Sequence, residues 1–178
     1  AFLQTYAKYV NLGSVTRISG RYVFKDSNII EVNTGNVTYL NSYSFYRCKK
    51  LKKFDAPNLT ESRSNVLREC VSLLEVHMPC IEIMSNNIFY GDTSLVYLNL
   101  GEKLNSVDPT ILDSTPNLKY LYIGTASTNA LKINRLIKEN PAIDYIFVNY
   151  SKYDSYYSAV YSTMKDNLRE YGVAVGEY

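Results

Sequence analysis

The sequence has no tryptophan and a single histidine, His77, and both shortages restrict the chemistry open to it. A catalytic triad needs an imidazole beside a nucleophile and a carboxylate, and a structural zinc site needs four cysteine or histidine ligands. The three cysteines, Cys48, Cys70 and Cys80, lack the close pairing of a metal site. None of the 8 glycines forms a phosphate-binding loop. The sequence therefore predicts no enzyme activity, no metal and no cofactor.

Long apolar runs and an excess of one charge are also missing. No stretch approaches the roughly 18 consecutive apolar residues of a membrane span, so we expect no membrane insertion. Lys and Arg number 19 against 17 Asp and Glu, which leaves no overall basic field and argues against a nucleic-acid partner. No signal peptide is visible at Ala1, although a mature or trimmed chain would look the same.

What the sequence does contain is typical of a folded domain with unusual aromatic content. Hydrophobic residues make up 46% and charged residues 20% of the 178 residues, which suits one domain with a real core. Tyrosine is abundant, with 18 copies against 6 phenylalanines. Any account of function has to say where these tyrosines lie.

One motif recurs along most of the chain: an apolar residue, two variable residues, an apolar residue, a variable residue and a third apolar residue. Its copies begin at Ile29, Leu51, Leu73, Leu95, Leu118 and Ile143, and the first four are spaced by 22 residues. A large apolar column precedes the copies, at Phe24, Phe45, Leu67, Phe89, Leu112 and Ile137. A small or polar column lies between the two, at Ser27, Cys48, Cys70, Asp92, Thr115 and Asn140.

A repeat of this length predicts a solenoid, because a single unit cannot bury its apolar face until neighbouring units stack on it. Each motif supplies one strand that pairs in parallel with the next, and about six strands form one curved parallel sheet. Alternation within a strand sends the apolar residues inward and the variable residues outward. We expect an α/β fold in which this sheet offers an outer, concave binding face.

The stretch from Leu40 to Pro57 resembles a leucine-rich repeat of the BspA-like subclass. It has the sequence motif of that family. Phe45 lies three residues before Cys48, Leu51 and Phe54 follow, and a proline comes after the strand. The resemblance implies a right-handed, horseshoe-shaped solenoid with an irregular to helical convex side. It also implies a non-enzymatic recognition protein, secreted or at the cell surface, that mediates adhesion through a protein or glycan ligand. Such a chain is a monomer or part of a larger multi-repeat protein.

The sequence predicts three regions. Residues 1–20 form an N-terminal cap, with a short helix through Phe2, Tyr6 and Val10, or a truncated upstream repeat. Residues 21–148 hold the repeats, with a helix over 127–140 on the far side of one unit. Residues 149–178 form a helical C-terminal cap, with a helix over 154–171 and a short strand at Val173 and Val175. A docking role for that helix in a larger assembly is the alternative function.

The outward positions of the strands give the candidate binding site. They are charged or polar in the N-terminal half, whereas in the C-terminal half they place aromatic residues on neighbouring strands. The predicted ligand-binding residues of the concave face are Tyr97, Tyr120, Tyr122, Tyr145, Phe147, His77 and Asn99. Clustered exposed aromatics mark interaction sites. Two alternatives remain: the rings only stabilise the sheet, or the C-terminal segment folds over them.

Other motifs carry weaker hypotheses. Cys48 and Cys70 occupy equivalent positions one turn apart, so they are either buried thiols or a disulfide. Asn36, Asn58 and Asn149 begin glycosylation sequons that matter only on a eukaryotic secretory route. The other tyrosines are expected in the N-terminal cap and turns, at Tyr6, Tyr9, Tyr22, Tyr39, Tyr43, Tyr46 and Tyr90, or in the C-terminal segment from Tyr150 onward.

Overall fold

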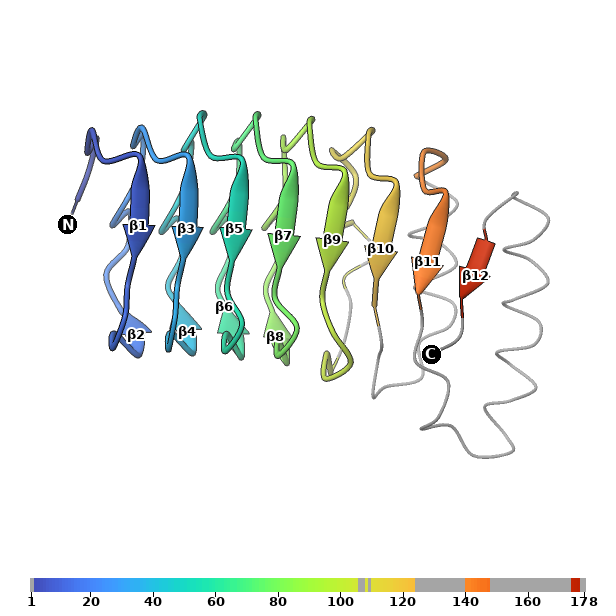
Figure 1. The fold of residues 1–178 in the computed structure, drawn as a ribbon, viewed down its shortest axis with the longest axis horizontal. Helices are drawn as coiled ribbons and strands as arrows, with labels where there is room; N and C mark the ends of the chain where they lie inside the picture. The colour runs from blue at the N-terminus through green and yellow to red at the C-terminus, as the bar shows by residue number, and fades with distance from the viewer. Residues whose placement is uncertain (1, 106–107, 109, 124–139, 148–173, 177–178) are drawn as a thin grey trace.

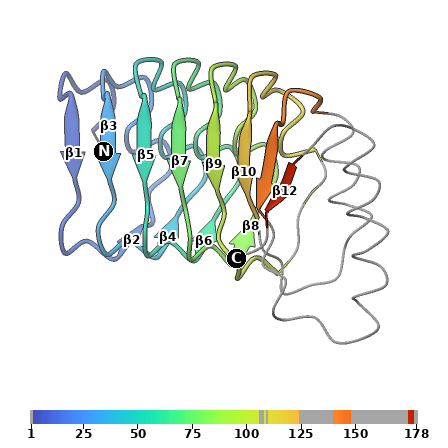
Figure 2. The same cartoon turned by 45° about the vertical axis from the view of Figure 1, so that its right-hand side comes forward.

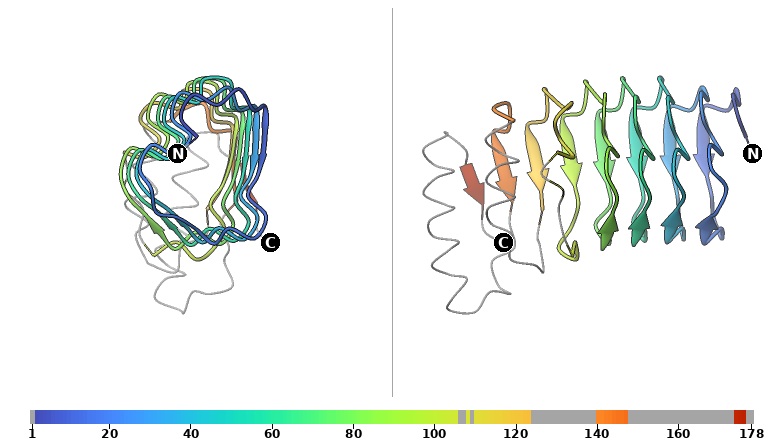
Figure 3. Two further views of the ribbon diagram at one scale, coloured as in Figure 1. Left: turned by 90° about the vertical axis from the view of Figure 1, so that its left-hand side faces the viewer. Right: turned by 180° about the vertical axis from the view of Figure 1, so that it is seen from behind.

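The chain winds into a parallel β-solenoid, as the repeat predicts (Figure 1). The computed structural model describes residues 2–105, 108, 110–123, 140–147 and 174–176. Seen along its long axis, successive turns lie almost on top of one another (Figure 3, left). Strands β1, β3, β5, β7 and β9 stand side by side in a nearly straight row in Figure 1.

An eight-stranded parallel sheet forms one side of the solenoid, in the order β1-β3-β5-β7-β9-β10-β11-β12. Its strands are β1 (Tyr9–Asn11), β3 (Glu31–Asn33), β5 (Lys53–Asp55), β7 (Glu75–His77), β9 (Tyr97–Asn99), β10 (Tyr120–Tyr122), β11 (Tyr145–Phe147) and β12 (Ala174–Gly176). The six strands predicted between residues 29 and 148 are confirmed. The short strand predicted near the C-terminus is confirmed as β12, paired with β11.

The register of this sheet follows the repeat. Glu31 pairs with Lys53, Lys53 with Glu75, and Glu75 with Tyr97, so equivalent residues of successive turns stand side by side. The central residue of each described strand from β3 to β11 is buried, and its neighbours face solvent to different degrees. Alternation therefore assigns the inward and outward positions as expected.

A second parallel sheet corrects the expectation of a single sheet with an irregular to helical convex side. It has four strands, β2 (Arg17–Ile18), β4 (Tyr39–Leu40), β6 (Glu61–Ser62) and β8 (Ile83–Met84), in the order β2-β4-β6-β8. Backbone bonds join its turns, such as Thr38 N–H to Thr16 O at 2.8 Å. Two-residue strands are too short to leave an alternating pattern, which is why the sequence did not reveal them.

At the N-terminus the structure replaces the expected helix by a strand. Residues Tyr9–Asn11 form β1, which pairs with β3 in the register of the later turns. The pattern of paired strands thus begins one turn earlier than residue 21, on the N-terminal side. No helix occurs in the part of the chain that the structure describes. The predicted helix over 154–171, and that over 127–140 except for Asn140, lie outside the described residues.

The core lies between the two sheets and is built from the predicted columns (Figures 2 and 3). Phe24 and Phe45 stack with ring centroids 4.9 Å apart, and Phe54 meets Phe45 edge-on at 5.2 Å. The described members of the large apolar column are buried; Ile137 lies outside the described residues. No helix among the described residues is long and apolar enough to cross a membrane.

The small column is a hydrogen-bond ladder. Cys48 Sγ donates to Phe24 O at 3.1 Å and Cys70 Sγ to Phe45 O at 3.2 Å, so each thiol serves a carbonyl of the previous turn. Both are buried free thiols, which corrects the suggestion of a disulfide between them. Because burial disfavours the thiolate, the pKa of Cys70 is raised well above its ordinary value. These cysteines are packing residues rather than reactive ones.

Candidate functional site

The outward side chains of the eight-stranded sheet form one continuous surface, which we call the open face. Its first column runs through Tyr9, Glu31, Lys53, Glu75, Tyr97, Tyr120 and Tyr145. Its second column runs through Asn11, Asn33, Asp55, His77, Asn99 and Tyr122. The character of the face changes from charged to aromatic between β7 and β9, as predicted.

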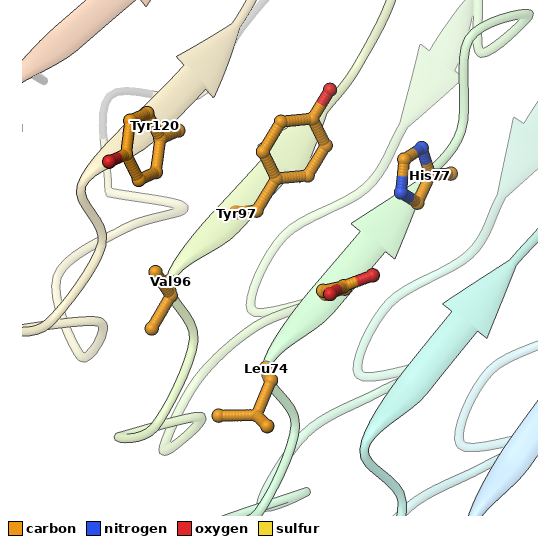
Figure 4. Close-up of a pocket in the computed structure, with 6 residues that line it drawn as sticks. Leu74, His77, Val96, Tyr97 and Tyr120 are labelled. Carbon is orange, nitrogen blue, oxygen red and sulfur yellow. The ribbon is translucent and has the colours of Figure 1, made fainter.

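A pocket of about 540 Å³ lies where the two characters meet. It is lined by Leu74, Glu75, His77, Val96, Tyr97 and Tyr120 (Figure 4). The figure shows His77, Tyr97 and Tyr120 side by side on three neighbouring strands, with Leu74 and Val96 below them. Three of the predicted site residues therefore belong to one concavity.

The rings of this region contact one another. His77 lies over Tyr97 with centroids 5.0 Å apart and planes inclined by 33°. Tyr120 stacks on Tyr145 at 5.2 Å with planes 8° apart, although Tyr145 does not line the pocket. Tyr120 and Tyr145 are 37% and 42% exposed, so both residues remain partly accessible to solvent in the stacked pair. Cross-strand stacking fixes the rings in place and leaves them available to a ligand.

The remaining predicted residues have structural partners. Tyr122 donates its hydroxyl to Glu102 Oε1 at 2.7 Å, and Asn99 Oδ1 accepts the Gly101 N–H at 2.8 Å in the turn after β9. Phe147 pairs with Tyr122 in the register of β10 and β11. The structure thus places Tyr122 and Asn99 beside the pocket, in roles that stabilise the turns.

Sequence reasoning missed two residues of the pocket floor, Leu74 and Val96. They occupy the position just before β7 and β9, which is lysine in three other turns, at Lys8, Lys52 and Lys119. Leu74 is 41% exposed, so part of its apolar surface stays in contact with water at a position where other turns carry lysine. Two adjacent apolar residues at a position that is charged in most other turns were the signal that could have identified the floor.

A second concavity of about 390 Å³ lies at the other end of the open face, over β1, β3 and β5. Glu31, Lys53 and Asp55 are among its lining residues, so it is polar where the first is apolar. Tyr9, expected in a cap, stands here at the edge of the sheet and is 68% exposed. This tyrosine is thus a further aromatic residue of the open face.

The pocket has little of the chemistry that catalysis needs. No cluster of three metal-ligating side chains occurs among the described residues. Glu75 lies near His77, but its carboxylate is engaged by Lys53 Nζ at 3.9 Å, and both side chains are about half exposed. An exposed pair of this kind is strongly screened by water. The arrangement suits the binding of an apolar or aromatic group, with the polar groups of Glu75, His77 and the two tyrosines available for hydrogen bonds beside it.

The family model for the BspA type leucine rich repeat region matches residues 1–135, with six copies. The chain belongs to the BspA-type leucine-rich repeat family. None of the curated proteins matches the sequence. Leucine-rich repeats of this kind are protein-interaction modules and are typically not enzymes. Fold and family identify neither the ligand nor the surface that binds it.

Proposed function

We propose that this BspA-type repeat protein binds a protein ligand through the pocket on the open face, holding an apolar or aromatic side chain of an extended segment. The observation that carries the proposal is that partly exposed aromatic rings and two partly exposed apolar side chains line the same pocket. Tyr97 and Tyr120 supply area and hydroxyl groups, and Leu74 with Val96 supplies the floor. Interfaces gain most from such aromatic anchors in a pocket.

Rigidity supports the same proposal. The lining residues come from consecutive hydrogen-bonded strands, and His77 and Tyr97 already contact each other at 5.0 Å. Little side-chain entropy is therefore lost when a ligand arrives. The charged pair of Lys53 and Glu75 borders the pocket on the N-terminal side and provides polar contacts at its rim.

The finer parts of this function are proposals of the same kind. We propose that the protein mediates adhesion at the cell surface or outside the cell, in keeping with the resemblance to BspA-like proteins. A glycan is the second ligand class that we propose, because stacked tyrosines also suit sugar rings. Detection of the full-length product on intact cells by an antibody against this domain, without permeabilisation, tests the location. Signal only after permeabilisation would refute it.

The pocket is tested with a random peptide library displayed on phage and selected on the purified protein. We expect selected peptides to carry an aromatic or large apolar residue and to bind Tyr97→Ala/Tyr120→Ala at least tenfold more weakly, because truncating interface hot spots has effects of this size. Tyr9→Ala is the matched control, since Tyr9 is an exposed tyrosine in the same column on a distant strand. Equal binding to the double variant and the native protein would refute the pocket.

The assembly role rests on the predicted C-terminal helix over 154–171, which lies outside the described residues. No contact in the described part favours it over the open face. Deleting the residues after Tyr150 separates the two roles: the selected peptides still bind if the pocket is the site and the shortened chain folds.

A further inference from the structure

The turns at the start of the solenoid carry a second distinctive surface, remote from the open face. It combines six cations, Arg17, Arg21, Lys25, Arg47, Arg63 and Arg68, with five tyrosines, Tyr22, Tyr39, Tyr43, Tyr46 and Tyr90. We call it the arginine–tyrosine surface. Arg17 and Tyr39 project outward from β2 and β4 of the four-stranded sheet, which lies across the core from the eight-stranded sheet (Figure 3, left).

Each cation lies against an aromatic ring. The Arg17 guanidinium carbon is 4.1 Å from the Tyr39 centroid, and that of Arg68 is 4.5 Å from the Tyr90 centroid. Arg21 is 5.5 Å from the centroids of both Tyr22 and Tyr43. Cation–π contacts of this length hold a cation in place while leaving N–H groups free for a further partner.

The backbone indicates that two of these tyrosines are present for more than folding. Tyr22 and Tyr43 have φ of 58° and 62°, in the left-handed region that bulky residues avoid. In the next two turns the equivalent positions are Asn65 and Asn87, a residue type that adopts this conformation at low cost. Tyrosine is thus the more strained choice here. The two rings stack at 4.9 Å and carry Arg21.

Positive charge exceeds negative charge on this surface. Its carboxylates are Asp26, Glu61 and Glu69, against the six cations. Asp26 pairs with Arg47 at 3.1 Å and with Lys25 at 3.8 Å; Glu61 pairs with Arg63 at 2.8 Å and Glu69 with Arg68 at 3.2 Å. Among the described residues, Arg17 and Arg21 are exposed and have no carboxylate partner. The overall charge of +2 conceals this local excess.

We propose that the arginine–tyrosine surface binds an acidic polysaccharide, one that carries sulfate or carboxylate groups along its chain. Lys25, Tyr46, Arg68 and Tyr90 each follow the large apolar column by one residue, so cations and rings alternate from turn to turn along the solenoid axis. Within the described part of the chain, Arg17 and Arg21 add positive charge without a carboxylate partner at the start of the solenoid. Guanidinium groups pair with sulfate and carboxylate oxygens through two parallel hydrogen bonds. A linear polyanion that crosses these turns meets cations of more than one turn.

The covered rings favour a polysaccharide over single-stranded nucleic acid. Sites for single strands rely on free aromatic faces on which bases stack. Here Tyr22 stacks on Tyr43 and carries Lys25 and Arg21 within 5.5 Å, so its faces already have partners. What the surface still offers is charge and N–H donors, which match anionic sugar substituents.

The test measures binding of dextran sulfate, with unsulfated dextran as the neutral counterpart, by calorimetry at low and at physiological salt. We expect dextran sulfate alone to bind, more weakly as salt rises, because exposed charges are screened. Arg17→Gln/Arg21→Gln should bind about tenfold more weakly, since each exposed ion pair contributes modestly. Absence of dextran sulfate binding at low salt would overturn the proposal.

A matched control is Lys50→Gln/Lys103→Gln, which removes the same charge from exposed lysines outside the surface. An equal loss in this control would show a non-specific effect of net charge and overturn the site. Arg17→Lys/Arg21→Lys keeps the charge but lacks the planar fork, and we expect intermediate affinity. An oligothymidylate or phosphatidylserine vesicles binding as tightly as dextran sulfate, with the same sensitivity to Arg17→Gln/Arg21→Gln, would overturn the assignment to polysaccharide. Tyr97→Ala/Tyr120→Ala should leave dextran sulfate binding unchanged, which separates this surface from the pocket.

Discussion

Asp92 is the most consequential departure from the repeat within the core, and replacing it should stabilise the protein. It occupies the small column at the position of Cys48 and Cys70 and is fully buried. Its Oδ1 accepts the Cys70 N–H at 2.8 Å, whereas its buried Oδ2 has no hydrogen-bond partner among the described residues. Desolvation raises the pKa of the Asp92 carboxyl well above its ordinary value, and nearby Glu69 adds to the shift, against the opposing hydrogen bond from Cys70.

Asp92→Cys restores the ladder. Each thiol of this column donates to a carbonyl of the previous turn, so a cysteine at 92 is placed to donate to Leu67 O. Cys70 N–H loses one acceptor but keeps its bond to Leu67 O at 3.2 Å. A buried unsatisfied polar group costs about 1–3 kcal/mol, so we expect a gain of that size in the free energy of unfolding at neutral pH. For a chain of this length the melting temperature rises by roughly 2–4 °C per kcal/mol.

The pH dependence gives the sharper test. Because the pKa of Asp92 is raised in the folded state, its neutral form favours folding below the unfolded-state pKa of about 3.9, and this advantage is lost as pH rises through the folded-state pKa. The advantage of Asp92→Cys, and of the isosteric Asp92→Asn, should therefore widen from pH 4 to pH 7 in urea unfolding. Asp144→Asn, at an exposed aspartate, is the control for lost charge. A gap that stays constant with pH, or a variant less stable at pH 7, would refute this reasoning.

Three further predictions concern the turns and the core. Gly101 has φ of +61°, and a Cβ there would collide with the carbonyl of Pro79 in the turn before, so Gly101→Ala should lower the free energy of unfolding by about 3 kcal/mol or more. Gly13 has φ of +54° but open space around it, so Gly13→Ala should lower it by only about 1 kcal/mol. Thr34→Val removes a buried hydroxyl without a hydrogen-bond partner and should stabilise by about 1 kcal/mol. Tyr122→Phe loses the 2.7 Å hydrogen bond and should destabilise by about 1 kcal/mol while peptides selected on the pocket bind as before. Urea unfolding checks all three, and equal costs for the two glycine variants would contradict the steric argument.

The repeat allowed the main sheet to be predicted down to its register. Steps of 22 to 25 residues between copies of the motif, together with alternation within each copy, leave a single way to stack the units, so the outward columns followed from sequence alone. The first strand was not located, although an upstream repeat was one of the two alternatives for residues 1–20. Ala7, Val10 and Leu12 fit the motif, but alanine makes a weak first position. The second sheet was missed for another reason: its two-residue strands are defined by backbone bonds between turns, which side-chain patterns do not encode.

The candidate site was predicted in part. The tyrosine columns located the aromatic half of the open face, and the pocket includes Tyr97, Tyr120 and His77. Its floor of Leu74 and Val96 lies one residue outside the alternating strand, so the inward and outward assignment did not apply to it. The arginine–tyrosine surface depends on turns whose shape comes from left-handed residues such as Tyr43, and a hydrophobic pattern carries no information about those.

The register has a consequence for how proteins of this kind change over generations. Paired outward residues advance by 22 from Tyr9 to Glu31, Lys53, Glu75 and Tyr97, then reach Tyr120 and Tyr145 by longer steps of 23 and 25. The strands remain paired, so the added residues are accommodated between strands rather than in the sheet. Lengthening between strands, or duplication of a whole turn, is therefore tolerated, whereas a single residue inserted within a strand would reverse its inner and outer faces. Mutations that lengthen a segment between strands, or that duplicate a whole turn, can thus change the connecting segments while the residues of the pocket on the open face stay the same.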